Sequence, residues 1–172
     1  VWFKRDLRIA DHVPIYKASK ESIPFIPLYV LDQNYWSQDF SSIRHWNFVY
    51  DCLEELNIEL SNIGQPLIIK KGSAVKIFRE IQSNFKINKV YAHEETSNYW
   101  VRKENLSVKN WFVENLIEFI EYPTNGVVRG LESRDEWIKI KNQRLFSEVI
   151  PSPAKVKKIE NFRSDLISRK SI

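Results

Sequence analysis

The chain has 172 residues, 43% of them hydrophobic and 28% charged, which suits one domain with a buried core and excludes a wholly disordered polypeptide. Its net charge of +4 is uneven: residues 129–172 hold 11 Lys or Arg against 6 Asp or Glu, a balance of +5, so the first 128 residues sum to −1. The main body is therefore not expected to bind nucleic acid through a basic surface, and the tail is expected to be a solvated surface or a phosphate-contacting segment.

The cysteine count, the histidine spacing and the hydropathy pattern exclude further classes. The single Cys52 excludes an internal disulfide and a cysteine-based metal site. His12, His45 and His93 lack the spacing of metal ligands, so no metal site is predicted. No run of about 18 apolar residues and no leader is visible, so we expect a cytoplasmic protein without a membrane span.

Short β-branched apolar runs alternate with segments of helical periodicity, the pattern of a parallel α/β sheet. Strands are predicted, in chain order, at residues 1–3, 25–31, 66–70, 89–93 and 117–122. Helices are predicted at residues 11–20, 42–63, 73–85, 98–115 and 133–146. The longest helix has Ser41 or Ser42 available as its amino-terminal cap and Gly64 at its end.

Five strands with four crossover helices predict the α/β class: a Rossmann-like, doubly wound parallel sheet with strand order 3-2-1-4-5 and helices on both faces. This domain is expected to span residues 1–150. Pro151 and Pro153 then interrupt the chain, and periodicity is weak beyond them. Residues 151–172 are therefore expected to start an interdomain linker.

The first predicted strand runs directly into a loop of alternating charges, residues 4–8. Ligands of open α/β sheets bind at the carboxyl ends of the strands, so Arg5 and Arg8 are candidates for contact with an anion or cofactor. The alternative is a set of ion pairs that fixes the loop, with Asp6 and Asp11 pairing within it. The sequence leaves these two interpretations about equal.

Two further strand ends carry polar residues. The fourth strand is followed by Glu94 and Glu95, which either bind a ligand hydroxyl or ring nitrogen or stabilise the start of the next helix; no catalytic residue is predicted. Gly72 and Ser73 follow the third strand, where a plain helix cap is the default and backbone phosphate binding the alternative.

The second strand ends at Asp32, and an aromatic loop leads from there to Arg44. Its rings, Tyr35, Trp36 and Phe40, either stack on a flat ligand or cover the edge of the sheet.

The chain opens with the run Trp2-Phe3-Lys4-Arg5-Asp6-Leu7-Arg8, followed by Asp11. This run closely resembles the opening of the DNA photolyase/cryptochrome family and matches seven consecutive positions of the family pattern. Further similarity lies in Ser42-Ile43-Arg44, in His93-Glu94-Glu95-Thr96 with Asn98, and in residues 126–131 with Arg134 and Trp137. The resemblance spans residues 1–153, with departures at Glu104-Asn105, where relatives often have Arg-Asp, and at His12, where Asn is common.

This resemblance implies the amino-terminal α/β domain of a flavoprotein. In the family, that domain holds an antenna chromophore, which is a folate, a deazaflavin or a flavin, while a helical domain binds FAD and damaged DNA. The implied parent protein is a deoxyribodipyrimidine photolyase, a carbon–carbon lyase that repairs pyrimidine dimers by light-driven electron transfer. The FAD-binding domain, against which this domain is expected to pack, lies outside this chain.

Two other functions stay open on sequence grounds: cryptochrome-type blue-light signalling and a stand-alone nucleotide-binding α/β module. The expected ligand crevice lies where the strand order reverses, between the first and fourth strands. The residues predicted to bind the cofactor share a position at or beside strand ends; they are Phe3, Lys4, Arg5, Arg8, Asp32, Arg44, Glu94, Glu95 and Asn98.

Overall fold

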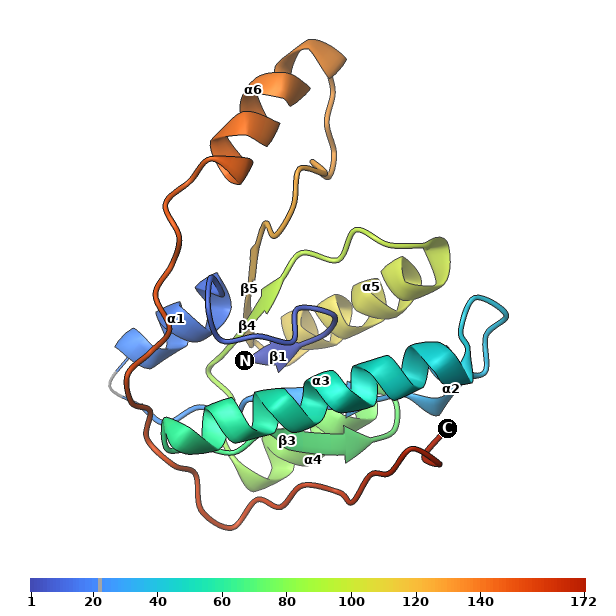
Figure 1. Ribbon diagram of the computed structural model, residues 1–172, viewed down its shortest axis with the longest axis vertical. Helices are drawn as coiled ribbons and strands as arrows, with labels where there is room; N and C mark the ends of the chain where they lie inside the picture. Colours follow the sequence, from blue (N-terminus) through green and yellow to red (C-terminus); the bar gives the residue numbers. More distant parts are fainter. Residues whose placement is uncertain (22) are drawn as a thin grey trace.

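A computed structural model describes residues 1–21 and 23–172 and contains a five-stranded parallel sheet (Figure 1). The strand order is β3-β2-β1-β4-β5, as predicted, and every neighbouring pair is parallel. The strands are β1 (Trp2–Phe3), β2 (Leu28–Leu31), β3 (Ile68–Lys71), β4 (Lys89–His93) and β5 (Glu118–Tyr122).

Helices cover both faces of the sheet, which confirms the doubly wound architecture. They are α1 (Val13–Lys20), α2 (Gln33–Trp36), α3 (Ile43–Asn62), α4 (Ala74–Asn84), α5 (Tyr99–Glu114) and α6 (Arg134–Leu145). One core lies under α4 and α5, and the other lies under α1, α2 and α3. Successive strand residues alternate between them: Trp2 enters the first core and Phe3 the second.

Sequence periodicity located the elements to within three residues at each end, except for α2. This four-residue helix falls in the segment interpreted as an aromatic loop, because one turn is too short to show a helical repeat. Asp32 starts it by accepting a hydrogen bond from the Asn34 backbone N–H, at 2.9 Å.

The predicted caps of α3 are both present. The Ser42 side chain accepts a hydrogen bond from the His45 backbone N–H, and Gly64 follows the last turn with a φ of +116°. Glycine suits that position because a side chain is strained at positive φ. A Cβ there would also lie 2.7 Å from the Val156 carbonyl oxygen, so the position is crowded as well.

Beyond β5 the chain leaves the sheet, forms α6 apart from the main body, and returns as a long irregular segment (Figure 1). That segment follows the exposed edge of β3, where Asp165 N–H donates to the Ile69 carbonyl at 2.8 Å and Ser164 Oγ accepts from Ile69 N–H at 2.9 Å. Val156 within it is buried, and Phe162 packs against the core. The interpretation of residues 151–172 as an interdomain linker stays a prediction, but part of this stretch covers a sheet edge.

Among the described residues, no helix is both long and apolar enough to cross a membrane.

Candidate functional site

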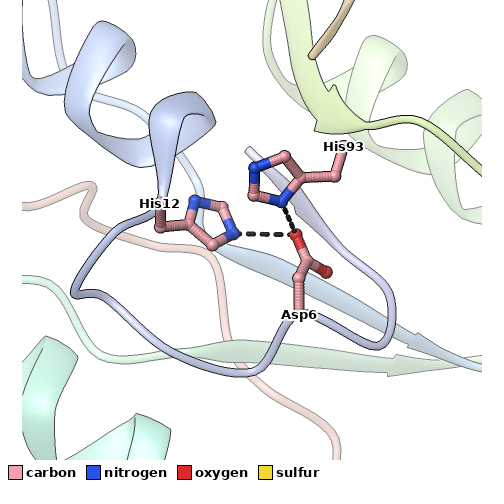
Figure 2. A group of neighbouring side chains, drawn as sticks. All are labelled: Asp6, His12 and His93. Carbon is pink, nitrogen blue, oxygen red and sulfur yellow. Dashed lines mark hydrogen bonds and ion pairs between the residues drawn. The ribbon is translucent and has the colours of Figure 1, made fainter. Parts of the chain in front are cut away.

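The loop after β1 is held by a buried carboxylate between two histidines (Figure 2). Asp6 Oδ2 lies 2.8 Å from Nε2 of His12 and 2.6 Å from Nδ1 of His93, while Oδ1 accepts from Lys4 N–H at 2.8 Å. Asp6, His12 and His93 are 7%, 0% and 4% exposed. These three residues, which we call the Asp6 cluster, join the β1 loop to the start of α1 and the end of β4.

Hydrogen bonding fixes the proton positions in the Asp6 cluster. His12 Nδ1 accepts from Ile15 N–H at 3.2 Å as the amino-terminal cap of α1, so its proton resides on Nε2 and points to Asp6. His93 likewise donates its Nδ1–H to the same carboxylate. Burial alone would disfavour an ionised Asp6, but the two imidazole donors outweigh it and hold the pKa of Asp6 well below its usual range.

The Asp6 cluster has the composition of a metal site, since its ligand atoms lie within 4.8 Å of one another. Its geometry favours shared protons instead. A tetrahedral zinc ion about 2.0–2.1 Å from each ligand sets the ligand atoms more than 3 Å apart, farther than these hydrogen-bond distances. A metal on His12 Nε2 would also move the proton to Nδ1, against the Ile15 N–H that now donates there.

Lys4 turns away from solvent and ties β1 to α5. Its Nζ donates to the His93 carbonyl at 3.1 Å and to Asn105 Oδ1 at 2.9 Å, and it lies 4.5 Å from the centre of the Trp2 ring. Burial lowers the pKa of Lys4, and the carboxylates of Glu121 and Glu95 counteract that effect in part.

Arg5 and Glu95 form an ion pair across the ends of β1 and β4. Glu95 is 4% exposed, and its Oε1 also accepts from the backbone N–H groups of Thr96 and Ser97, both at 3.0 Å. Arg8 instead donates to the carbonyls of Ala10 and Asp11.

Residues 4–11 are all described, and the structure does not show the alternative interpretation, in which Asp6 and Asp11 form ion pairs within the β1 loop. Within the loop the Asp6 carboxylate binds the Lys4 backbone N–H; its imidazole partners are His12 and His93, and Asp11 Oδ1 accepts from the Ile150 backbone N–H at 3.2 Å. The pairing of β1 with β4 brings His93 to Asp6, and the segment after α6 brings Ile150 to Asp11, so both partners are distant in sequence.

An apolar cavity of about 400 Å³ opens beside this loop, at the carboxyl ends of β1 and β2. Tyr35 of α2 and Trp100 of α5 approach each other beside it, with ring centroids 5.9 Å apart, and Cys52 of α3 also lines it. We call it the aromatic cavity; its aromatic lining residues are Trp2, Phe3, Tyr29, Tyr35, Trp36, Phe48 and Trp100.

A second, polar crevice shares Lys4, Arg5, Arg8 and Glu95 with the aromatic cavity and continues past them toward β5. Its other lining residues are Asp6, His93, Glu94, Thr96, Ser97, Thr124 and Asn125.

Of the nine residues predicted to bind a cofactor, six line the aromatic cavity: Phe3, Lys4, Arg5, Arg8, Asp32 and Glu95. Glu94 lines only the polar crevice, where it pairs with Arg129 at 3.3 Å and Arg144 at 3.6 Å. Arg44 and Asn98 line neither: Arg44 is exposed, and the Asn98 side chain caps α5.

The loop after β3, the alternative phosphate site, offers little for a phosphate to bind. The Gly72 backbone N–H already donates to the Leu31 carbonyl, and Ser73 occupies the cap position of α4 without a side-chain hydrogen bond.

Sequence reasoning did not place Cys52, Trp100, Glu104 and Asn105 at the site. For Glu104 and Asn105, the sequence signal was that both depart from the family pattern, in which Arg-Asp is often found at these positions. Trp100 belonged to the same segment of family resemblance as His93 and Asn98, but nothing there pointed to a cavity. Cys52 gave no signal, because it looks like an ordinary helix residue until α3 and α5 converge on the same strand ends.

Comparison with known proteins identifies the family. The family model described as DNA photolyase matches residues 1–144. The chain belongs to the DNA photolyase family. This confirms the resemblance drawn from the sequence, and the strand order confirms the expected α/β domain.

Several curated relatives of this photolyase-family chain are cryptochromes. It is 25% identical over 142 residues to Cryptochrome DASH of Synechocystis. This match covers 80% of this chain and 26% of the relative. It is 30% identical over 112 residues to a chloroplastic/mitochondrial Cryptochrome DASH of Arabidopsis thaliana. This match covers 62% of this chain and 20% of that relative. The chain therefore spans about a quarter or less of these proteins.

Solved structures agree in fold. A Synechocystis cryptochrome superposes with a TM-score of 0.78 at 17% identity, covering 96% of this chain and 38% of that one. A photolyase from Sulfolobus tokodaii superposes with a TM-score of 0.69 at 23% identity, covering 92% of this chain and 37% of that one. That structure is described with two FAD molecules and the implication of a novel light-harvesting cofactor.

Proposed function

We propose that this domain binds a planar chromophore in the aromatic cavity and passes absorbed light energy to FAD held elsewhere in the full-length protein. The observation that carries the proposal is the open cavity at the carboxyl ends of β1 and β2, beside the point between β1 and β4 where the strand order reverses. Its volume of about 400 Å³ lies in the usual range for small-ligand sites, and its walls are apolar with a few charged groups. The chain's own Tyr and Trp side chains line this space and leave it open.

The lining suits a flat ring system with polar substituents. Tyr35 and Trp100 offer faces for stacking, while Arg5, Arg8 and Glu95 offer hydrogen-bond groups on one side. A flavin, a deazaflavin or a folate carries both kinds of group. The light-harvesting cofactor described for the Sulfolobus tokodaii photolyase supports the same use of a related domain.

In the full-length protein, we propose light-driven repair of pyrimidine dimers in DNA, in the cytoplasm, with this domain packed against the FAD-binding domain that contacts the damaged strand. Blue-light signalling is the alternative, favoured by the several cryptochromes among the relatives. Dimer repair by the full-length protein under light separates the two, since signalling alone requires no loss of dimers.

Ligand titration of this protein tests the chromophore proposal. Riboflavin, a deazaflavin and folate are titrated in turn while ligand fluorescence is followed, with micromolar binding of at least one expected. Cys52→Trp fills the aromatic cavity from α3 and is expected to weaken binding by more than about tenfold.

The matched control is Ile58→Trp, which adds the same side chain to the same helix at a position that is 60% exposed and outside the cavity. It is expected to leave affinity unchanged. Binding that survives Cys52→Trp, or that is lost equally in both variants, contradicts the proposed location.

A further inference from the structure

The Asp6 cluster holds the loop that forms one wall of the aromatic cavity. Asp6, His12 and His93 do not themselves line that cavity, whereas Lys4, Arg5 and Arg8 of the same loop do. Both carboxylate oxygens of Asp6 are engaged, Oδ1 by the Lys4 backbone N–H and Oδ2 by the two imidazoles. The position of the wall therefore depends on His12, the cap of α1, and on His93 of β4, which lie outside the lining of the aromatic cavity.

This arrangement is compatible with only one protonation state of His12. Nε2–H donates to Asp6, and Nδ1 accepts from Ile15 N–H. A second proton must therefore go to Nδ1, where it opposes the Ile15 N–H and ends the cap of α1. A proton added to Asp6 Oδ2 meets two N–H donors in the same way.

We propose that His12 and His93, acting through Asp6, are positioning residues for the aromatic cavity, and that protonation of His12 in mild acid releases the loop of residues 4–8. This inference deepens the proposed function by adding a control on the same site. The loop closes when His12 is neutral and opens when His12 takes up a proton.

The surroundings favour release over a stable buried cation. Burial lowers the pKa of His12, the hydrogen-bonded Asp6 carboxylate counteracts that effect in part, and the nearby His93 and Arg8 add to the lowering. The carboxylates after β4 are engaged in other ion pairs: Glu95 pairs with Arg5, and Glu94 pairs with Arg129 and Arg144. The titratable and charged groups around the cluster are Lys4, Arg5 and Arg8 from the β1 loop, Asp11 beside His12, Glu94 and Glu95 after β4, and Tyr122 of β5, aligned with His93.

Amide hydrogen exchange measures loop release directly. The reporters are the backbone N–H groups of Lys4, bonded to Asp6, and of Ile15, bonded to His12. After correction for the intrinsic pH dependence of exchange, their protection is expected to fall by up to about tenfold per pH unit below pH 6.5, where an open loop lets His12 take up a proton.

His12→Asn isolates the titration, because Asn keeps an oxygen that can cap α1 and does not ionise near neutral pH. Its Lys4 protection is expected to be independent of pH between 5 and 7. His45→Asn is the matched control, removing a histidine outside the Asp6 cluster, and it should keep the fall. A fall that persists in His12→Asn overturns the proposal.

Imidazole ¹⁵N spectra of the unaltered protein provide a test that does not depend on a variant folding. At pH 7 they should show His12 as the neutral Nε2–H tautomer and His93 with its proton on Nδ1. A His12 proton on Nδ1, or an imidazolium at pH 7, overturns the proposal.

Adding riboflavin tests whether the loop and the aromatic cavity are coupled. A ligand that binds only the closed loop should raise Lys4 protection about a hundredfold at 100 times its dissociation constant. Riboflavin binding with unchanged Lys4 protection, or with protection independent of pH, overturns the inference and leaves the proposed function standing. Protection that falls in acid without binding of any ring ligand supports acid release of the loop and overturns the proposed function.

Discussion

The rings of Tyr35 and Trp100 lie 5.9 Å apart beside the aromatic cavity, although 65 positions separate them in the chain. Tyr35 belongs to the short helix α2 and Trp100 to the first turn of α5. Phe40 completes the group at 5.4 Å from Tyr35 and 6.5 Å from Trp100. Of these three rings, Tyr35 and Trp100 line the open space at the strand ends.

Trp100→Ala is expected to weaken binding of a ring ligand by about 2- to 13-fold, because it removes one aromatic pair worth about 0.5–1.5 kcal/mol. Fluorescence titration with the ligand that binds the unaltered protein measures it. Trp137→Ala on α6 removes an indole outside the cavity and should leave affinity unchanged. Equal losses in both variants would mean that Trp100 acts through stability rather than through stacking.

Leu116→Gly is expected to stabilise the protein by about 1 kcal/mol. Leu116 follows α5 with a φ of 55° and is 94% exposed, so its side chain adds strain without adding packing. The bonds from Leu116 N–H to the Val113 carbonyl and from Ile117 N–H to the Phe112 carbonyl form a closing turn that normally carries glycine.

Urea unfolding compares Leu116→Gly with Leu116→Ala, which removes the side chain beyond Cβ but keeps the strained backbone. The alanine variant should change stability by less than about 0.5 kcal/mol. The same gain in both variants would trace the effect to surface hydrophobicity instead of backbone strain.

Stability is expected to fall as the pH drops below 6.5. Burial lowers the pKa of His12 in the folded protein, so below its ordinary value of 6.5 the unfolded chain takes up a proton that the folded chain does not. This residue alone reduces the free energy of unfolding by up to about 1.4 kcal/mol per pH unit. Asp6, whose pKa is also lowered, adds a loss of the same sign as the pH falls below its ordinary value of 3.8.

Urea unfolding at pH 7.0 and 5.5 measures that slope in the unaltered protein, in His12→Asn and in His45→Asn. The slope should shrink in the first variant and persist in the second. A slope that is the same in all three proteins would assign the acid sensitivity to other groups.

Truncation after Pro153 is expected to destabilise the domain by about 2–4 kcal/mol and to promote aggregation. It exposes the edge of β3 and removes the buried Val156 together with the bonds that Ser164 and Asp165 make to Ile69. Urea unfolding and light scattering measure the two effects.

Asp165→Asn is the mild counterpart of that truncation. It keeps an oxygen for the Lys71 backbone N–H and loses only the ion pair with Lys70, so a change below about 0.5 kcal/mol is expected. A truncated chain as stable as the full one would show that the segment only rests on the edge.

The sequence by itself determined the fold class, the strand order and most element boundaries. The element boundaries follow from local periodicity and from caps such as Ser42. The strand order follows from the doubly wound topology that alternating strands and helices predict. The motif of seven consecutive residues, 2–8, contributes four of the six predicted residues that line the cavity. Asp32 and Glu95 join them because the carboxyl ends of parallel strands share one edge.

Only the tertiary structure decided which side chains meet. His93 lies 81 positions from His12, and no spacing rule connects them. His12 reaches Asp6 as the cap of α1, and the pairing of β1 with β4 brings His93 to the same carboxylate. Trp100 reaches the cavity only because α5 starts beside α2, and residues 164–165 satisfy the edge of β3 through contacts almost a hundred positions away. Contacts between distant segments depend on the packing of whole elements, which local sequence signals do not encode.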